Sequence, residues 1–474
     1  MRTFKKKNIV ILAVVIFSLL MICVGFYRIM SNSKTAIEYS RGRDTEINLN
    51  NLNELNDNIG GKNIQGRILS YDGDILWSED YAGYEDTFSL VGLYRNGVQL
   101  SSNTVCSNYQ DVLLFNTDEY SYLKGIKSVY GKTGDIELTL DHELNSKVYS
   151  YMKENGVYNG NVLLLDDSGR TIVSVSLPSI SPTKHIDIKE LENGTLINKN
   201  LNGLYFPGST MKIPTSVVLA SLEGENVINE KYNCDGIEIL ADGSGITCKE
   251  HGEKQLYSAL GSSCNNFFAN AVTNYMNNNK EKSMEEFKNM GFSLNNIEYD
   301  NVDRLTRNKS FSTFNGRENF KSVWSCIGEY SVKVNSYDMC NIVSAVFNDG
   351  TCSEPYIIER IKYKNGNIIN HKNQIKKQIM EKDAANIVLK EWQKAFEIFY
   401  TEDEYNNIIV AKTGTAESEI IKGNGKKTKV DSSVLLGRML INNKPVSFFI
   451  NIEDYKITKS DAKAVAKFIA DNAN

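Results

Sequence analysis

The stretch YFPGSTMKIPTS, residues 205–216, places Ser209 three positions before Lys212, after a Pro-Gly pair and before the apolar run SVVLASL. In an α-helix with about 3.6 residues per turn, positions i and i+3 lie on one face, so the two side chains come within reach of each other. Pro214 restricts where this helix begins, because proline lacks the amide that would bond back to the preceding turn. We therefore predict a helix that begins at about Ser209, with the serine at the positive end of the helix dipole.

The sequence offers Ser209 no usual histidine base. The chain has 4 histidines, none in a recognisable catalytic setting, and the residues after Ser209 do not form a G-x-S-x-G elbow. A lysine can act as the base when burial and nearby positive charge lower its pKa from about 10.4 to about 7. Lys412, in the predicted strand AKTGTAE, is a second cation that would add to this lowering. Ser209 is therefore a candidate nucleophile with Lys212 as its base.

Two further polar motifs follow the serine–lysine pair. They are Ser263-Cys264-Asn265 in GSSCNNFF and Lys412-Thr413-Gly414-Thr415 in AKTGTAE. Each motif alone has a structural explanation, as a solvated helix face, a cap, a turn or a strand edge. In this order, S-x-x-K, S-x-N and K-T-G form the motif set of the penicillin-binding proteins and serine β-lactamases. The chain therefore resembles that superfamily.

The letters around the motifs resemble one branch of it, the class B penicillin-binding proteins, which are monofunctional D,D-transpeptidases of peptidoglycan synthesis. YFPGSTMKIPTS is similar to the family's Y-P-P-G-S-x-x-K-I run, and AKTGTAE to its G-K-T-G-T-A-E strand. KEHGEKQLYSALGSSCNNFF is similar to its H-G…A-L-x-x-S-C-N-x-x-F segment. The likeness covers residues 136–474, and the segment between 30 and 135 is too short for the glycosyltransferase domain of the bifunctional class A proteins.

The resemblance implies roles for residues in all three motifs. The catalytic residues would be Ser209, Lys212, Ser263, Asn265 and Lys412, and the substrate-binding residues Thr413, Gly414 and Thr415. It implies that Ser209 is acylated and that Lys212 is its general base. The Ser263 hydroxyl would relay a proton, and the Asn265 amide would hold a substrate carbonyl.

The K-T-G strand would form the other side of the site. The resemblance implies that Lys412 supplies electrostatic stabilisation and that the hydroxyls of Thr413 and Thr415 meet the substrate carboxylate. Gly414 would let backbone come close. The backbone N–H groups of Ser209 and Thr415 are the expected oxyanion hole.

Two segments near the expected cleft depart from the family pattern. IGEYSVKVNSYDM, residues 327–339, stands where many members have I-G-Q-G before a helix. DSSVLLG, residues 431–437, replaces the histidine, tryptophan and phenylalanine usual after the K-T-G hairpin. These departures bear on acceptor binding and penicillin affinity, while the serine–lysine constellation is intact.

Strand patterns occur at both ends of the segment 136–474. NVLLLDDSGRTIVSVSLPS (161–179) predicts a hairpin, and NIIVAKTGTAE (407–417), SSVLLGRMLI (432–441) and PVSFFINI (445–452) predict an antiparallel meander. Helical patterns lie between them, and KSDAKAVAKFIADN predicts a last helix capped by Thr458 or Ser460. We therefore predict an α/β (α+β) fold, with a five-stranded antiparallel sheet flanked by helices and a helical subdomain, the penicillin-binding transpeptidase fold.

The N-terminal part predicts a membrane anchor and a pedestal. NIVILAVVIFSLLMICVGFY, residues 8–27, has no charged side chain and is long enough to cross a bilayer, although a cleaved signal peptide is the alternative. Basic residues precede it, so we expect the N-terminus in the cytoplasm and the rest outside, in the cell membrane by a single pass. The expected domains are an anchor at 1–30, a small, mostly β pedestal at 31–135 and a transpeptidase domain at 136–474.

The composition limits the partners. A formal net charge of −5, without an arginine-rich motif, argues against nucleic acid binding. The 8 cysteines contain no C-x-x-C pair, so we predict no metal and no cofactor. Cys234 and Cys248 are either a local disulfide or two reduced, buried cysteines.

We expect a membrane-anchored serine D,D-transpeptidase that cross-links peptidoglycan stem peptides through an acyl-enzyme on Ser209. β-Lactams would be covalent inhibitors, and a polytopic SEDS glycan polymerase is an expected partner. Alternatives are a serine β-lactamase or D,D-carboxypeptidase, in which water takes the acyl group, and a non-catalytic β-lactam sensor or scaffold of wall synthesis. The persistence of a penicillin label on Ser209 separates a transpeptidase from a β-lactamase.

Overall fold

The described part of the chain excludes its N-terminus. The computed structural model describes residues 66–113, 133–182, 191–400 and 407–473, with short gaps at 79–80, 82, 96–97, 241–242, 295, 318, 331, 364–365, 372–374 and 422–426. The predicted membrane span at 8–27 lies outside these residues. Within them, every helix is too short or too polar to cross a bilayer.

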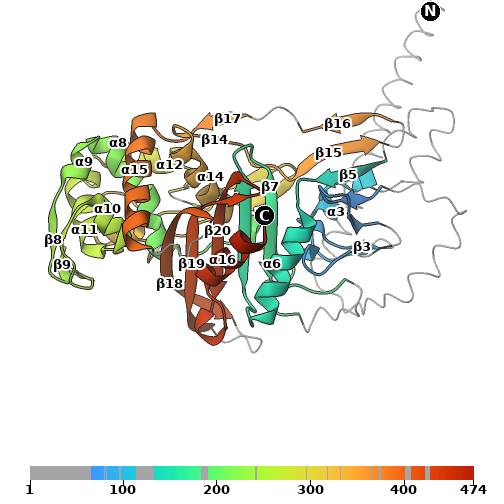
Figure 1. The fold of residues 1–474 in the computed structure, drawn as a ribbon, viewed down its shortest axis with the longest axis horizontal. Coiled ribbons are helices and arrows are strands. Elements are labelled where there is room, and N and C mark those ends of the chain that lie inside the picture. The colour runs from blue at the N-terminus through green and yellow to red at the C-terminus, as the bar shows by residue number, and fades with distance from the viewer. Residues whose placement is uncertain are drawn as a thin grey trace, which may run out of the picture. The chain divides into compact units, whose positions relative to one another are not determined.

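A five-stranded antiparallel sheet forms the centre of the C-terminal part, as predicted (Figure 1). Its strand order is β18-β19-β20-β6-β7, so strands from the two ends of the segment pair with each other. The strands are β6 (Gly160–Asp166), β7 (Thr171–Leu177), β18 (Ile408–Ile421), β19 (Lys427–Ile441) and β20 (Lys444–Glu453). β18 and β19 extend beyond the predicted runs, and β18, which carries the K-T-G motif, is an edge strand.

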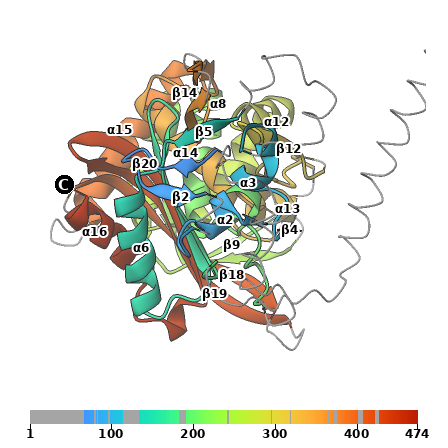
Figure 2. The ribbon, with the colours of Figure 1, turned by 90° about the vertical axis from the view of Figure 1, so that its right-hand side faces the viewer.

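The sheet is buried on both faces. Because side chains alternate along a strand, Val162 and Leu164 face one core while Leu163 and Leu165 face the other. The first core is covered by α6 (His142–Glu154) and α16 (Ala462–Asn472), which pack against each other (Figure 2). The second core lies against the helical part of the chain.

The helical part lies between β7 and β18 in sequence, as predicted. Its helices are α7 (Lys199–Asn202), α8 (Lys212–Glu223), α9 (Asn226–Asn229), α10 (Leu256–Gly261), α11 (Asn265–Ala271), α12 (Lys280–Asn289), α13 (Asn319–Ile327), α14 (Ser336–Phe347) and α15 (Lys382–Phe399). Small two-stranded pairs, which were not predicted, join them: β8 (Tyr232–Cys234) with β11 (Gly252–Lys254), β9 (Ile237–Ile239) with β10 (Gly245–Thr247), β12 (Tyr299–Val302) with β13 (Leu305–Asn308), and β14 (Thr351–Ser353) with β17 (Lys376–Gln378).

A second five-stranded sheet joins segments that are far apart in sequence. Its order is β16-β15-β5-β1-β2, from β1 (Ile68–Leu69), β2 (Ile75–Trp77), β5 (Gly134–Leu138), β15 (Ile358–Tyr363) and β16 (Ile368–Asn370). In Figure 1 the teal β5 lies beside the orange β15, and β16 follows on the other side of β15. The buried Glu137 carboxylate on β5 accepts hydrogen bonds from Arg360, 2.8 Å away, and lies 2.9 Å from Lys362. The expected domain boundary at 135/136 thus falls within a strand, and the division stays a prediction.

The region 66–113 contains helices as well as strands. β3 (Tyr94–Arg95) and β4 (Val98–Gln99) form a hairpin, while α2 (Phe88–Val91), α3 (Val105–Asn108) and α4 (Gln110–Leu113) are single turns. The apolar side chains of these turns, such as Leu90 and Val105, are buried in the same core as the helical part. The described pedestal is therefore mixed rather than mostly β.

The cap of the last helix differs from the prediction. The Asp461 carboxylate, not Thr458 or Ser460, accepts the N–H of Ala464, 3.0 Å away. The Thr458 hydroxyl instead donates to the Tyr455 carbonyl, a hydrogen bond within the turn that precedes the helix. An aspartate also has a favourable charge at a helix N-terminus.

This cap makes a prediction about stability. Asp461→Ala should lower the free energy of unfolding by about 1 kcal/mol, because the Ala464 amide loses its acceptor. Asp461→Asn keeps an acceptor oxygen and should cost less. Urea unfolding of both purified variants measures the difference, and equal losses would contradict the assigned cap.

Candidate active site

The serine of the S-x-x-K motif sits in a tight turn before a buried helix. A 3-10 turn, η5 (Gly208–Met211), carries Ser209, and α8 begins at Lys212, so the helical path begins close to the predicted residue. Pro214 lies in the first turn of α8, where proline is tolerated. Gly208 has a φ of 51°, and a Cβ on it would lie 2.5 Å from the Thr415 carbonyl oxygen. Only glycine lets the two segments approach this closely.

Lys212 brings the first two motifs together. Its Nζ lies 2.9 Å from Ser209 Oγ, 2.8 Å from the Ser263 carbonyl oxygen and 2.7 Å from Asn265 Oδ1. The side chain has no solvent exposure. Burial lowers the pKa of Lys212 to about 8, which makes the neutral amine accessible near neutral pH. The lysine can therefore accept the proton of the Ser209 hydroxyl.

Lys412 approaches the same group from β18. Its Nζ donates to Ser263 Oγ at 3.1 Å and to the Thr413 carbonyl at 2.8 Å. Lys212 Nζ lies 3.3 Å from that hydroxyl, so Ser263 stands between two buried amines. Burial and the charge of Lys212 hold the pKa of Lys412 well below its usual value. This arrangement can pass a proton between the lysines through one hydroxyl.

The S-x-N motif occupies the turn between α10 and α11. Ser263 has a φ of 57°, a left-handed conformation that is uncommon for serine. This conformation lets its carbonyl and its hydroxyl both reach Lys212. Cys264 then caps α11 by accepting the Phe267 amide through Sγ at 3.5 Å.

The K-T-G strand runs directly beside the serine turn. A Cβ on Gly414 would lie 2.5 Å from the Pro207 carbonyl oxygen and 3.2 Å from the Thr210 nitrogen, so this position requires glycine. Thr413 is half-buried and Thr415 is exposed, on the part of β18 that runs beside the serine turn. All eight residues predicted from the three motifs therefore lie at one junction between β18, η5 and the α10–α11 turn.

Glu329 is a titratable residue of this site that the motifs did not identify. It follows Gly328, whose carbonyl oxygen accepts the Gly208 amide at 3.0 Å, so it lies next to the serine turn. Burial and the charge of Glu417 raise the pKa of Glu329 to about 7, against an opposing effect of Lys212. The sequence showed that residues 327–339 depart from the family pattern, but it predicted no role for Glu329.

Comparisons with known proteins identify a family for most of the chain. The family model described as "Penicillin binding protein transpeptidase domain" matches residues 160–473. The peptidoglycan D,D-transpeptidase PbpA of Mycolicibacterium smegmatis is 21% identical over 339 residues, which are 66% of this chain and 67% of that protein.

Solved structures share the fold. The D,D-transpeptidase domain of a peptidoglycan glycosyltransferase from Eggerthella lenta matches with a TM-score of 0.66 and 19% identity, over 85% of this chain and 96% of that one. The penicillin G acyl-enzyme complex of penicillin-binding protein A from M. tuberculosis matches with a TM-score of 0.68 and 17% identity, over 85% and 97%. Because the family model matches more than half of this chain, the chain belongs to the penicillin-binding protein transpeptidase family.

Proposed function

We propose that the protein is a serine D,D-transpeptidase that cross-links peptidoglycan stem peptides through an acyl-enzyme on Ser209. The observation that carries this proposal is the buried Lys212 amine, 2.9 Å from Ser209 Oγ and with a lowered pKa. Membership of the transpeptidase family supports it, as does the name of the M. smegmatis relative, a peptidoglycan D,D-transpeptidase.

The geometry supports an acylation step by nucleophilic attack. Ser209 Oγ attacks the carbonyl carbon of the terminal D-Ala-D-Ala bond while its proton moves to neutral Lys212. The oxyanion forms beside the backbone N–H groups of Ser209 and Thr415, on segments that lie in contact. Collapse breaks the C–N bond, and the leaving D-alanine amine takes the proton through Ser263.

The second step returns the enzyme to its starting state. An amine from a neighbouring stem peptide attacks the ester and loses a proton to the lysine pair, and Ser209 leaves as the hydroxyl. Asn265 would orient the donor peptide, and the hydroxyls of Thr413 and Thr415 with Lys412 would hold its carboxylate. A β-lactam would enter at the same carbonyl position and remain as an ester. Penicillin-binding protein A of M. tuberculosis forms an acyl-enzyme complex with penicillin G.

A hydrolase is the second candidate function, and Glu329 is the observation that favours it. A carboxyl group with its pKa raised to about 7 beside the serine turn is suited to activate a water. A β-lactamase or a D,D-carboxypeptidase would use such a water to release the acyl group. The lifetime of the acyl-enzyme separates this candidate from a transpeptidase.

We also propose that the protein is anchored in the cell membrane by one helix at 8–27, with residues 136–474 on the extracytoplasmic side. The uncharged apolar run and the basic residues before it support this orientation. A polytopic SEDS glycan polymerase would supply the nascent glycan strand at the same membrane surface. Pull-down of such a polymerase by the detergent-solubilised full chain tests this partner.

Labelling with a fluorescent penicillin tests the nucleophile. The wild-type protein should gain one adduct that persists for hours, and Ser209→Ala should gain none, because no other group would form the ester. Intact mass and peptide mapping locate the label. An adduct on Ser209→Ala, or none on the wild type, contradicts the proposal.

The pH dependence of acylation tests the base. Because the pKa of Lys212 is about 8, its neutral fraction should rise about tenfold per pH unit below that value, and the second-order acylation rate should rise with it. The rate should level off above about pH 8. Stopped-flow labelling between pH 5.5 and 9.5 measures the profile, and a rate independent of pH would exclude this lysine as the base.

Replacing Glu329 separates the two candidate functions. The charge of Glu329 raises the pKa of Lys212, so Glu329→Gln should move the acylation profile to lower pH. A transpeptidase should keep the same acyl-enzyme lifetime in this variant. A lifetime that lengthens at least tenfold would instead identify Glu329 as a hydrolytic base.

A further inference from the structure

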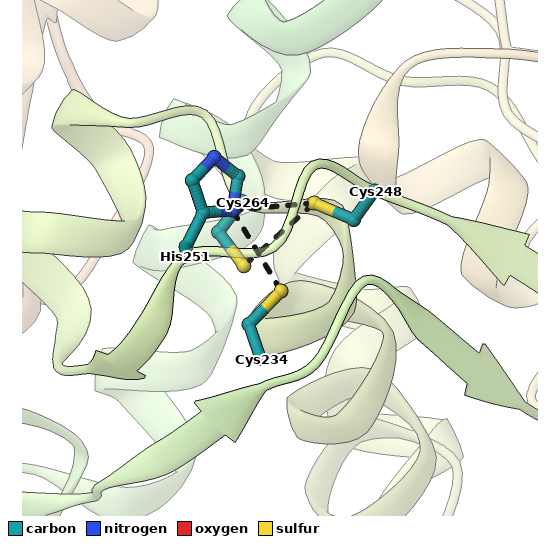
Figure 3. A group of neighbouring side chains, drawn as sticks. All are labelled: Cys234, Cys248, His251 and Cys264. Carbon is teal, nitrogen blue, oxygen red and sulfur yellow. Dashed lines mark hydrogen bonds between the residues drawn. The ribbon is translucent and has the colours of Figure 1, made fainter.

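Three cysteines and a histidine converge beside the S-x-N motif. Their sulfur and ring nitrogen atoms all lie within 4.8 Å of one another, and the side chains point toward a common centre (Figure 3). They come from the end of β8, from the segment between β10 and β11, and from the N-cap of α11: Cys234, Cys248, His251 and Cys264. Four metal-binding side chains from three segments thus meet at one point.

The separations fit a tetrahedral zinc ion. Bond lengths of about 2.3 Å for Zn–S and about 2.0 Å for Zn–N give tetrahedral edges of about 3.8 Å between sulfurs and about 3.5 Å between sulfur and nitrogen. Cys248 Sγ lies 3.9 Å from Cys264 Sγ. His251 Nδ1 lies 3.5 Å from Cys248 Sγ and 3.7 Å from Cys234 Sγ. We propose that these four side chains bind one Zn²⁺ ion.

The donor set and its surroundings favour zinc over a disulfide. All three cysteines are free, and 3.9 Å is far longer than the S–S bond of about 2.05 Å. Three sulfurs and one imidazole form a common structural zinc set, whereas a disulfide would use only two of the sulfurs. The amide of Asn265 donates to Cys248 Sγ at 3.2 Å, and that of Phe267 to Cys264 Sγ at 3.5 Å. Such N–H groups stabilise and orient thiolate ligands.

The charges at the site are compatible with this ion. Binding displaces three thiol protons to solvent, so one Zn²⁺ with three thiolates and a neutral histidine carries a net charge of −1. Lys249 and Lys254 are close in sequence to the ligands Cys248 and His251 and would offset this negative charge. Cys234 and Cys264 are buried, while Cys248 and His251 are half-buried and give the ion a route from solvent.

The ion would hold one wall of the active site. Cys264 lies between Ser263 and Asn265, and the Asn265 amide is bonded to a second ligand sulfur. Both neighbours contact Lys212 Nζ. The metal would therefore be a positioning element for the S-x-N motif, and this second part of the inference rests on the proposed function.

The sequence prediction of no metal rested on the absence of C-x-x-C pairs and of the usual spacing of zinc ligands. Cys248 and His251 form a C-x-x-H pair, which is the local signal that was available. Of the remaining ligands, Cys234 lies 14 residues before Cys248, and Cys264 lies 13 residues after His251. Their approach follows from the small strand pairs, which the sequence did not predict.

Metal analysis of the detergent-solubilised full chain tests the site. Wild-type protein should contain one zinc per chain after dialysis, and replacement by Co²⁺ should give the visible bands and thiolate charge-transfer absorption of a tetrahedral site. Cys248→Ser and His251→Ala should weaken zinc binding by more than about a hundredfold, since even outer-shell changes cost 10–100-fold. His251→Cys preserves a four-ligand set and should retain one zinc. Cys352→Ser, a cysteine outside the cluster, should bind like the wild type.

Several outcomes would overturn the zinc assignment. They are zinc lost equally from Cys248→Ser and Cys352→Ser, stoichiometric iron or copper in its place, and a Cys234–Cys248 disulfide by non-reducing peptide mapping. If the ligand variants do not fold, chelator competition on the wild type gives the affinity directly. Absence of both a bound metal and a cobalt spectrum then decides against the site.

The coupling to catalysis has a separate measurement. Removing zinc by chelation should slow penicillin acylation of Ser209 at least fivefold, and added zinc should restore it. A stoichiometric zinc with an unchanged acylation rate would overturn the positioning role and leave the metal site. Absence of any Ser209 adduct in both forms would contradict the proposed transpeptidase instead, whatever the metal content.

Discussion

The desolvation of one lysine amine organises the active site. An ammonium group taken from water is costly unless polar atoms replace its hydration, and Lys212 Nζ meets Ser209 Oγ, the Ser263 carbonyl and Asn265 Oδ1. These oxygens come from two segments about fifty residues apart, so the lysine joins η5 and α8 to the α10–α11 turn. The same burial that makes the amine a base also requires these segments to meet. Stability and reactivity therefore depend on one set of contacts.

The second constraint is the close approach of two backbones. Gly208 lies so close to the backbone of β18, and Gly414 so close to the backbone of the serine turn, that neither position has room for a Cβ. Gly328 packs in the same way against the carbonyl of Gly208. Three glycines thus place the serine turn between an edge strand and the loop after α13. Side chains occupy backbone groups of this edge strand, because Trp392 donates to the Ala411 carbonyl and Lys412 donates to the Thr413 carbonyl.

The sequence predicted which residues meet at the site better than it predicted the surrounding structure. All eight residues predicted from the motifs lie at the junction of β18, η5 and the α10–α11 turn. The spacing of residues within each motif reflects the backbone conformation of that segment, which is a local property. The central sheet and the helices between its strands followed from hydrophobic periodicity. Glu329 was not identified, because its raised pKa depends on burial by segments distant in sequence. The cluster at Cys234 was missed for a similar reason, since short strand pairs such as β8 with β11 leave little periodic signal.

The sheet that contains β5 has a consequence for how the chain can fold. β5 pairs on one side with β1 and on the other with β15, and the hydrogen bond from Arg360 to Glu137 spans 223 residues. β15 can pair with β5 only after most of the helical part, which precedes β15 in sequence, has been synthesised. Completion of this sheet is therefore a late, long-range event. Until then β5 presents an open edge to other strands. A truncation that ends near residue 135 would remove most of β5 and leave β1 without this neighbour. The N-terminal region is therefore completed by the rest of the chain and does not constitute a transferable module.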